Sequence, residues 1–138
     1  MSLFNVFTIA GSAMNADSVL LNTTSSNLAN ANAASSSSGQ TYKARYPVFG
    51  AEFNRVMSKQ GQGVPVKVLA IVESDKPLRM EYNPDHPMAN EQGYIFKPNV
   101  NVMEEMANMI IASRSYQTNV EVAQATKQML MRTLQMGQ

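Results

Sequence analysis

Residues 101–136 read NVMEEMANMIIASRSYQTNVEVAQATKQMLMRTLQM and decide how this chain folds. Positions spaced alternately by four and three form one mostly apolar stripe, the period of a helix that packs against a partner helix. The stripe consists of Val102, Met106, Met109, Ser113, Tyr116, Val120, Ala123, Lys127, Leu130 and Leu134. Asn101 can cap the helix, Glu104 and Glu105 favour its first turn, and Gly137 favours its end. A helix of about 35 residues is about 50 Å long, too long for the core of a compact globule of this size.

Residues 3–30 predict a second helix with the same kind of stripe. Phe7, Met14, Leu21 and Leu28 lie seven positions apart, as in a heptad repeat. No proline interrupts this segment, and Gly11 is its only helix-weakening residue. Other apolar residues widen the stripe, so we do not expect one partner helix to cover all of it.

Between the two helices the hydrophobic period changes from a helical one to two. Alternating β-branched and aromatic residues predict short strands at 42–48, 64–72, 78–82 and 94–96. Glycine- and proline-containing turns at 61–63, 75–77 and 83–87 separate them. The small polar residues of 29–40 predict a helix end followed by a loop.

The predicted fold class is therefore α+β. N- and C-terminal helices, in residues 1–32 and 100–138, form a coiled-coil-like layer, and a small β-rich module with a flexible first loop occupies residues 33–99. The part of this module that carries the predicted strands, residues 42–98, has about 57 residues and therefore little core of its own. Two helices side by side each bury one stripe, so further helices from other copies or other proteins must cover the rest. The predicted subunit-interface residues are Phe7, Met14, Leu21, Leu28, Met106, Met109, Tyr116, Val120, Ala123, Leu130 and Leu134.

Composition removes most other classes of function. The 138 residues carry a net charge of +1, which argues against a protein that binds nucleic acid through its phosphates. The chain has no cysteine and one histidine, so it lacks thiolate sites and a histidine metal cluster. No apolar run reaches the length of a membrane span. The first basic residue is Lys43, so we expect no cleaved secretory signal.

Few residues could carry catalysis, and each has a simpler interpretation. His86 stands between Asp85 and Pro87, where it could act as a base in a small hydrolase, but a turn residue is the better interpretation. Asp75, Glu81, Asp85 and Glu91 do not follow a calcium-loop pattern, so we interpret them as solvated charges. The glycines at 61 and 63 do not form a phosphate loop, and the serines at 35–38 are not in a nucleophile elbow. We expect no enzyme activity, no cofactor and no metal.

Two charges lie within the stripes, Asp17 and Lys127. One interpretation is that both side chains are exposed to solvent at the rim of the helix contact. The other is mutual attraction across a helix contact, within or between subunits, because the two residues come level in an antiparallel pair with flush ends.

The terminal segments resemble the flagellar rod, hook and hook-associated proteins. Ser26-Asn27-Leu28-Ala29-Asn30 is similar to the N-terminal signature of that family. The stretches Pro98 to Met106 and Ala112 to Val120 resemble the proximal-rod members, as do Gly93-Tyr94 and the chain length. The resemblance covers essentially the whole chain and is loosest in 33–65. Ala33-Ala34 and Thr118 depart from the family pattern, but these departures do not affect the resemblance.

The resemblance implies a structural subunit of the proximal rod of the bacterial flagellar basal body. Such a subunit forms a helical tube around the protein export channel and transmits torque. The implied partners are copies of itself, the rod proteins FlgB and FlgF, the distal rod protein FlgG and the FliE adaptor. The implied location is the rod, reached through the flagellar type III apparatus, with no nucleic acid bound and no membrane insertion.

Two alternatives stay open at this point: a coiled-coil oligomeric adaptor unrelated to flagella, and a small hydrolase that uses His86. A membrane-surface role for the first helix is disfavoured, since it has no basic polar face. We also expect frayed or disordered ends in the isolated monomer, since uncovered heptads leave helices marginal.

Overall fold

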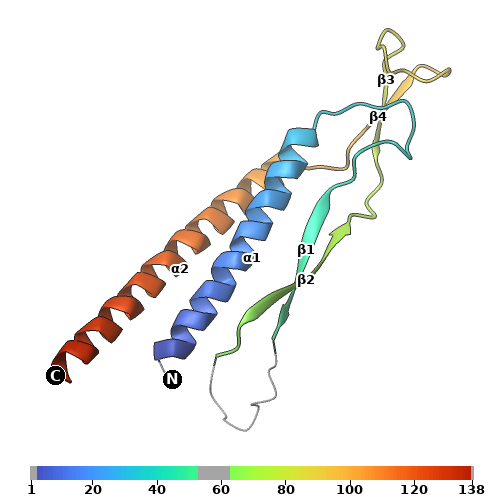
Figure 1. The fold of residues 1–138 in the computed structure, drawn as a ribbon. Helices are drawn as coiled ribbons and strands as arrows, with labels where there is room; N and C mark the ends of the chain where they lie inside the picture. Colours follow the sequence, from blue (N-terminus) through green and yellow to red (C-terminus); the bar gives the residue numbers. More distant parts are fainter. Residues whose placement is uncertain (1–2, 53–62, 138) are drawn as a thin grey trace.

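The computed structural model describes residues 3–52 and 63–137. Its longest elements are helix α1 (Leu3–Asn30) and helix α2 (Val102–Met136), which pack antiparallel, so that both termini lie at one end of the molecule (Figure 1). Both helices were predicted from the sequence, and the observed ends agree with the predicted ones to within one residue. The α+β class is confirmed, with the long helices packed together and small antiparallel sheets between them in the chain.

The ends of α2 follow from its sequence. The Asn101 side chain accepts a hydrogen bond from the Met103 amide at 3.2 Å, and Glu104 and Glu105 occupy the first turn. At the other end the Gly137 amide donates to the Leu134 carbonyl at 3.3 Å. These contacts confirm Asn101 as the predicted cap.

The strands form two separate hairpins. Strand β1 (Arg45–Ala51) pairs antiparallel with β2 (Val66–Glu73), with a bulge between Val48 and Phe49. Strand β3 (Arg79–Tyr82) pairs antiparallel with β4 (Tyr94–Lys97). All four predicted strands are present with shifted ends. The predicted turn at 61–63 falls mostly outside the described residues.

The largest shift is at β1, which begins at Arg45 rather than at Tyr42. The Ala44 amide donates to the Asn99 side chain, and the Tyr42 hydroxyl donates to Asn27. The Asn99 side chain thus occupies the backbone amide of Ala44 that a neighbouring strand would have bound.

The β1–β2 hairpin runs alongside α1, whereas the β3–β4 hairpin projects beyond the end of the helices (Figure 1). The Val66 amide donates to the Ser12 hydroxyl at 3.1 Å, which fixes β2 against the helix. One small cluster of buried apolar residues consists of Ala31, Ala44 and Val100, with Tyr42, Tyr46 and Val102 packed against it. Many large apolar side chains are consequently exposed, including Leu69 and Ile111, both at 64%.

Candidate functional site: a buried polar junction between the terminal helices

Two sequence motifs that lie far apart in the chain, residues 26–30 and 98–106, meet at one place in the fold. Asn27 near the end of α1 and Asn99 just before α2 both reach the start of β1. Both asparagines are buried, Asn27 completely. We call this region the junction and define it by Asn27, Ala44, Arg45, Asn99 and Glu105.

Asn27 acts on Arg45 as a neighbouring strand would. Its amide nitrogen donates to the Arg45 carbonyl at 2.9 Å, and its side-chain oxygen accepts from the Arg45 amide at 2.9 Å. The same oxygen accepts from the Tyr42 hydroxyl at 2.8 Å. A buried polar group is tolerated when its hydrogen bonds are made, so Asn27 joins α1 to β1 without an uncompensated cost.

Asn99 makes the matching connection from the α2 side. Its side-chain oxygen accepts from the Ala44 amide at 2.8 Å, and its nitrogen donates to the Lys76 carbonyl at 2.7 Å and the Ser74 carbonyl at 3.2 Å. The segment before α2 is therefore tied both to the residue before β1 and to the turn after β2.

Glu105 completes the junction from the first turn of α2. It is fully buried, and neither carboxylate oxygen has a hydrogen-bond partner among residues 3–52 and 63–137. Burial, and then the neighbouring Glu105 carboxylate, raise the pKa of Tyr46 to about 12. The junction thus favours the neutral phenol of Tyr46 next to the buried acid.

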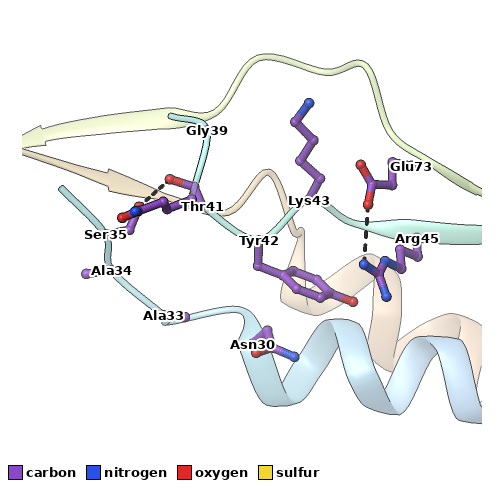
Figure 2. A pocket seen from close by; sticks show the side chains of 11 residues that line it. Asn30, Ala33, Ala34, Ser35, Gly39, Thr41, Tyr42, Lys43, Arg45 and Glu73 are labelled. Atoms are coloured by element: carbon purple, nitrogen blue, oxygen red, sulfur yellow. Dashed lines mark hydrogen bonds and ion pairs between the residues drawn. The ribbon is translucent and has the colours of Figure 1, made fainter. Parts of the chain in front are cut away.

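A polar hollow of about 520 Å³ lies beside the junction (Figure 2). In it Ser35 and Thr41 share a hydroxyl hydrogen bond of 2.5 Å, and Arg45 forms a 3.3 Å ion pair with Glu73. Both side chains of the ion pair are about half exposed, so it contributes little stability. The residues around this hollow include no base positioned against a nucleophile, and the arrangement supports packing rather than catalysis.

The helix pair has its own polar contact. Asp17 of α1 accepts from the Ser115 hydroxyl at 2.9 Å and from the Asn119 amide at 3.0 Å. The predicted attraction between Asp17 and Lys127 within one chain is therefore wrong. Lys127 lies eight residues, about 12 Å, beyond Asn119 along α2, because the helix ends are not flush. Attraction between the two charges of different copies stays a prediction.

Small and polar residues form most of the buried surface of both helices. They are Ala10, Ala16, Thr23, Thr24 and Asn27 on α1, and Glu105, Ala112, Ala123 and Thr126 on α2. Small side chains let the two helix backbones approach closely, and threonine hydroxyls bond within the helix, as Thr126 does to the Val122 carbonyl at 2.8 Å. The larger apolar residues of the two helices are half-buried or exposed.

The predicted interface residues lie at different depths in the single chain. Ala123 is buried against the neighbouring elements. Met14, Leu21, Leu28, Met109, Val120 and Leu130 are half-buried. Phe7, Met106, Tyr116 and Leu134 are exposed, Leu134 to 69%. Four of the eleven predicted residues are therefore exposed for contacts with other molecules, and six more keep part of their surface accessible.

The residues considered for catalysis do not come together. His86 lies in the turn between β3 and β4, where its Nδ1 accepts from the Met88 amide at 3.1 Å. The structure supports its interpretation as a turn residue. Within residues 3–52 and 63–137, no three histidine or carboxylate side chains are grouped as metal ligands. No helix in these ranges is apolar enough over a sufficient length to cross a membrane.

The sequence reasoning missed Asn27, Asn99 and Glu105 as structural residues. Asn27 and Asn99 were recognised only as part of motifs, and Glu105 only as a first-turn acid. One signal was readable: Asn27 lies in the last turn of the predicted helix, three residues before its end. Asparagine is unfavourable within a helix unless its side chain has another partner.

Comparison with known proteins gives matches at both ends and over the whole chain. The family model described as flagella basal body rod protein matches residues 7–34, and the one described as flagellar basal body rod FlgEFG protein C-terminal matches residues 91–136. The chain is 45% identical to the flagellar basal-body rod protein FlgC of Salmonella typhimurium (strain LT2) and to that of Yersinia enterocolitica, over the full length of all three chains. It is 41% identical over both full lengths to FlgC of Buchnera aphidicola subsp. Schizaphis graminum.

Proposed function

Because this chain belongs to the FlgC family of flagellar basal-body rod proteins, we propose that its terminal helices assemble into a helical tube around the protein export channel. The chain is a structural rod protein of the proximal rod and not an enzyme. In the tube it serves as part of the drive shaft and transmits torque.

One observation carries the proposal of assembly through the helices. The helices bury mainly small and polar residues against their own chain, while large apolar side chains along their length stay exposed. Each such side chain is worth roughly 1.5–3 kcal/mol when fully buried. The single chain does not gain this stabilisation, and contacts with neighbouring subunits can supply it.

The proposed contact surface is the stripe predicted from the sequence. Phe7 and Leu28 mark its ends on α1, and Met106 and Leu134 mark its ends on α2. Residues 1–32 and 100–138 would form the helical domain at the axis of the tube, with residues 33–99 on its outside. The packing of α1 against the β1–β2 hairpin supports this layering, since it leaves the other faces of the helices open to neighbours.

The mechanism follows from the symmetry of such contacts. Head-to-tail contacts that do not close generate a helical assembly. Long helices packed side by side along its axis transmit torque, because close-packed interfaces resist shear. Assembly and torque transmission of this kind need no bound cofactor.

We further propose as partners copies of the chain itself, FlgB, FlgF, the distal rod protein FlgG and the FliE adaptor. The route to the rod would be the flagellar type III apparatus, without a cleaved signal. The rod-family membership of the chain supports assembly with rod proteins in general.

Isolation of basal bodies tests the proposed function. In the bacterium that makes this protein, an epitope-tagged chain should co-purify with the axial shaft after the cytoplasmic and outer-membrane fractions have been removed. Imaging should place it in the shaft nearest the inner membrane. Recovery of the chain only as a free oligomer, with intact shafts that lack it, would instead support the adaptor interpretation.

A further inference from the structure

The β3–β4 hairpin, which we call the arm, is joined to the rest of the protein by few contacts. Among residues 3–52 and 63–137, its strands lie against neither helix and not against the β1–β2 hairpin, and the arm projects beyond one end of the helix pair (Figure 1). The chain enters the arm through residues 74–78 and leaves it through residues 98–101. The arm therefore has no interface with the helices that could hold its angle by packing.

A backbone bridge holds the base of the arm against the loop that follows α1. The Ser35 amide donates to the Phe96 carbonyl at 3.0 Å, and the Phe96 amide donates to the Ser35 carbonyl at 2.9 Å. Ser35 is buried and is itself held by its hydroxyl, which shares a hydrogen bond of 2.5 Å with Thr41 (Figure 2). The loop contributes one residue to this bridge rather than a strand, so a single pair of hydrogen bonds makes the contact.

Arg79, the first residue of β3, connects the arm to the start of α2. Its guanidinium donates to the carbonyl of Val100, two residues before the helix begins. Val100 is fully buried in the apolar cluster with Ala31 and Ala44. A guanidinium presents its donors in a fixed planar geometry, so this charge-assisted hydrogen bond restricts the direction of the arm as well as its distance. Arg79 thus anchors the arm to a part of the protein that is held by packing.

The two segments that connect the arm are also tied to each other. The Asn99 side chain donates to the Ser74 and Lys76 carbonyls, as described for the junction. Beside these bonds lies a hollow of about 500 Å³, whose lining includes Pro77 at the entry to the arm and Glu104 in the first turn of α2. Side chains do not fill this space, so hydrogen bonds rather than packing set the angle between the arm and the helix.

We infer that Arg79 and the Ser35–Phe96 bridge act together as a clasp, which fixes the angle of the arm so that a load on the arm passes into α2. Without the clasp the arm would pivot as a unit about residues 74–78 and 98–101, because its internal hydrogen bonds do not depend on the clasp. The Asn83 amide, for example, donates to the Gly93 carbonyl at 2.9 Å within the hairpin. This inference rests on the proposed function, since it identifies positioning residues that stiffen a subunit of the drive shaft.

Amide hydrogen exchange in isolated shafts tests the clasp through substitutions of Arg79. Arg79→Met keeps much of the aliphatic stem and removes the donor, so the bridge amides of Ser35 and Phe96 should exchange about tenfold faster. The Asn83 amide inside the hairpin should not change, because the arm moves as a unit. Arg79→Lys retains a charged donor and should keep most of the protection. The control Lys67→Met removes one positive charge from an exposed position of β2 and should alter none of these amides.

The comparison of these amides separates a clasp from a general stabilising role of Arg79. Equal acceleration at Asn83 and at the bridge amides would show that Arg79 supports the hairpin itself, and unchanged exchange at the bridge would show that Arg79 does not hold it closed. Either result overturns the inference and leaves the rod assignment intact. Absence of the unsubstituted chain from the shafts overturns the proposed function, and with it the load that the clasp is inferred to carry.

Detachment of flagella by shear tests whether the clasp carries load. In bacteria that make only the Arg79→Met variant, severalfold more flagella should detach at a given shear than with Arg79→Lys or Lys67→Met, at equal amounts of chain in the shafts. The chain has no native cysteine, and residues paired across an antiparallel bridge lie within disulfide range. A disulfide between Ser35→Cys and Phe96→Cys should therefore restore resistance to shear in the Arg79→Met chain. Equal detachment in all variants, or detachment that the disulfide does not reduce, would overturn the inference.

Discussion

The Asp17 carboxylate of α1 and the Asn119 side-chain amide of α2 are joined by a 3.0 Å hydrogen bond, although 102 positions separate them in the sequence. Ser115 donates to the same carboxylate oxygen at 2.9 Å. This contact sets the register of the antiparallel pair, because Asp17 is the only charged residue of α1. A one-turn slip would leave its charge without these donors.

Asp17→Ala should therefore weaken the helix pair. Hydrogen bonds to charged groups contribute about 1.5–3 kcal/mol, and partial exposure places this case at about 1 kcal/mol. A double-mutant cycle with Asn119→Ala, followed by urea unfolding, measures the coupling. Independent, additive effects of the two substitutions would show that the contact does not hold the register.

Asn27→Ala should open the junction. The substitution removes both hydrogen bonds to the Arg45 backbone, and a buried polar group left unpaired costs about 1–3 kcal/mol. Amide hydrogen exchange at Arg45 should accelerate, while exchange in the β3–β4 hairpin should not change. Asn27→Asp is the harsher variant: it keeps the acceptor for the Arg45 amide but sets a buried carboxylate against the Arg45 carbonyl, so the free energy of unfolding should fall at least as much as in Asn27→Ala.

Tyr46 should make the folded state less stable at alkaline pH. Its folded-state pKa is raised to about 12, whereas in the unfolded chain it has the ordinary value near 10. The stability that this difference contributes is fully present below pH 10 and is lost as the pH rises from 10 to about 12. Tyr46→Phe should reduce the fall in melting temperature over this interval, since phenylalanine does not ionise. The same fall in both proteins would contradict the assignment.

Leu130→Asp should leave the chain soluble and block its incorporation into the rod. Leu130 is half-buried on the proposed interface stripe, where a carboxylate would lose its hydration on assembly. Gln135→Asp adds the same charge at an exposed position of α2 and should incorporate normally. The measurement is the amount of each variant in purified basal bodies relative to the soluble fraction. Equal incorporation of the two variants would show that Leu130 is not part of the interface.

The elements could be predicted because their signals are local. The cap at Asn101, the end at Gly137 and the period of residues 3–30 are all set by neighbouring residues in the sequence. The alternation at 64–72 likewise predicted β2 to within two residues. Each of these features depends on contacts within a few positions along the chain.

The junction could not be predicted, because its partners are distant in sequence. The bond from the Ala44 amide to Asn99 spans 55 positions, and nothing near either residue indicates the other. The sequence also does not indicate which surface α2 buries within its own chain. Met106, one of the predicted subunit-interface residues, is 49% exposed, whereas the helix buries small residues such as Ala112. The two helices therefore pack against each other through small side chains that allow close approach, rather than through large apolar ones.

The central claim is that the terminal helices reach full stability only when neighbouring subunits cover them. Amide hydrogen exchange measures the protection of both helices, which can be compared directly between the dilute monomer and the assembled shaft. We predict weak protection over residues 3–30 and 102–136 in the monomer, and protection at least a hundredfold stronger in the shaft, as roughly 3 kcal/mol of added stability would give. Strong protection of both helices in the dilute monomer, unchanged on assembly, would contradict the account.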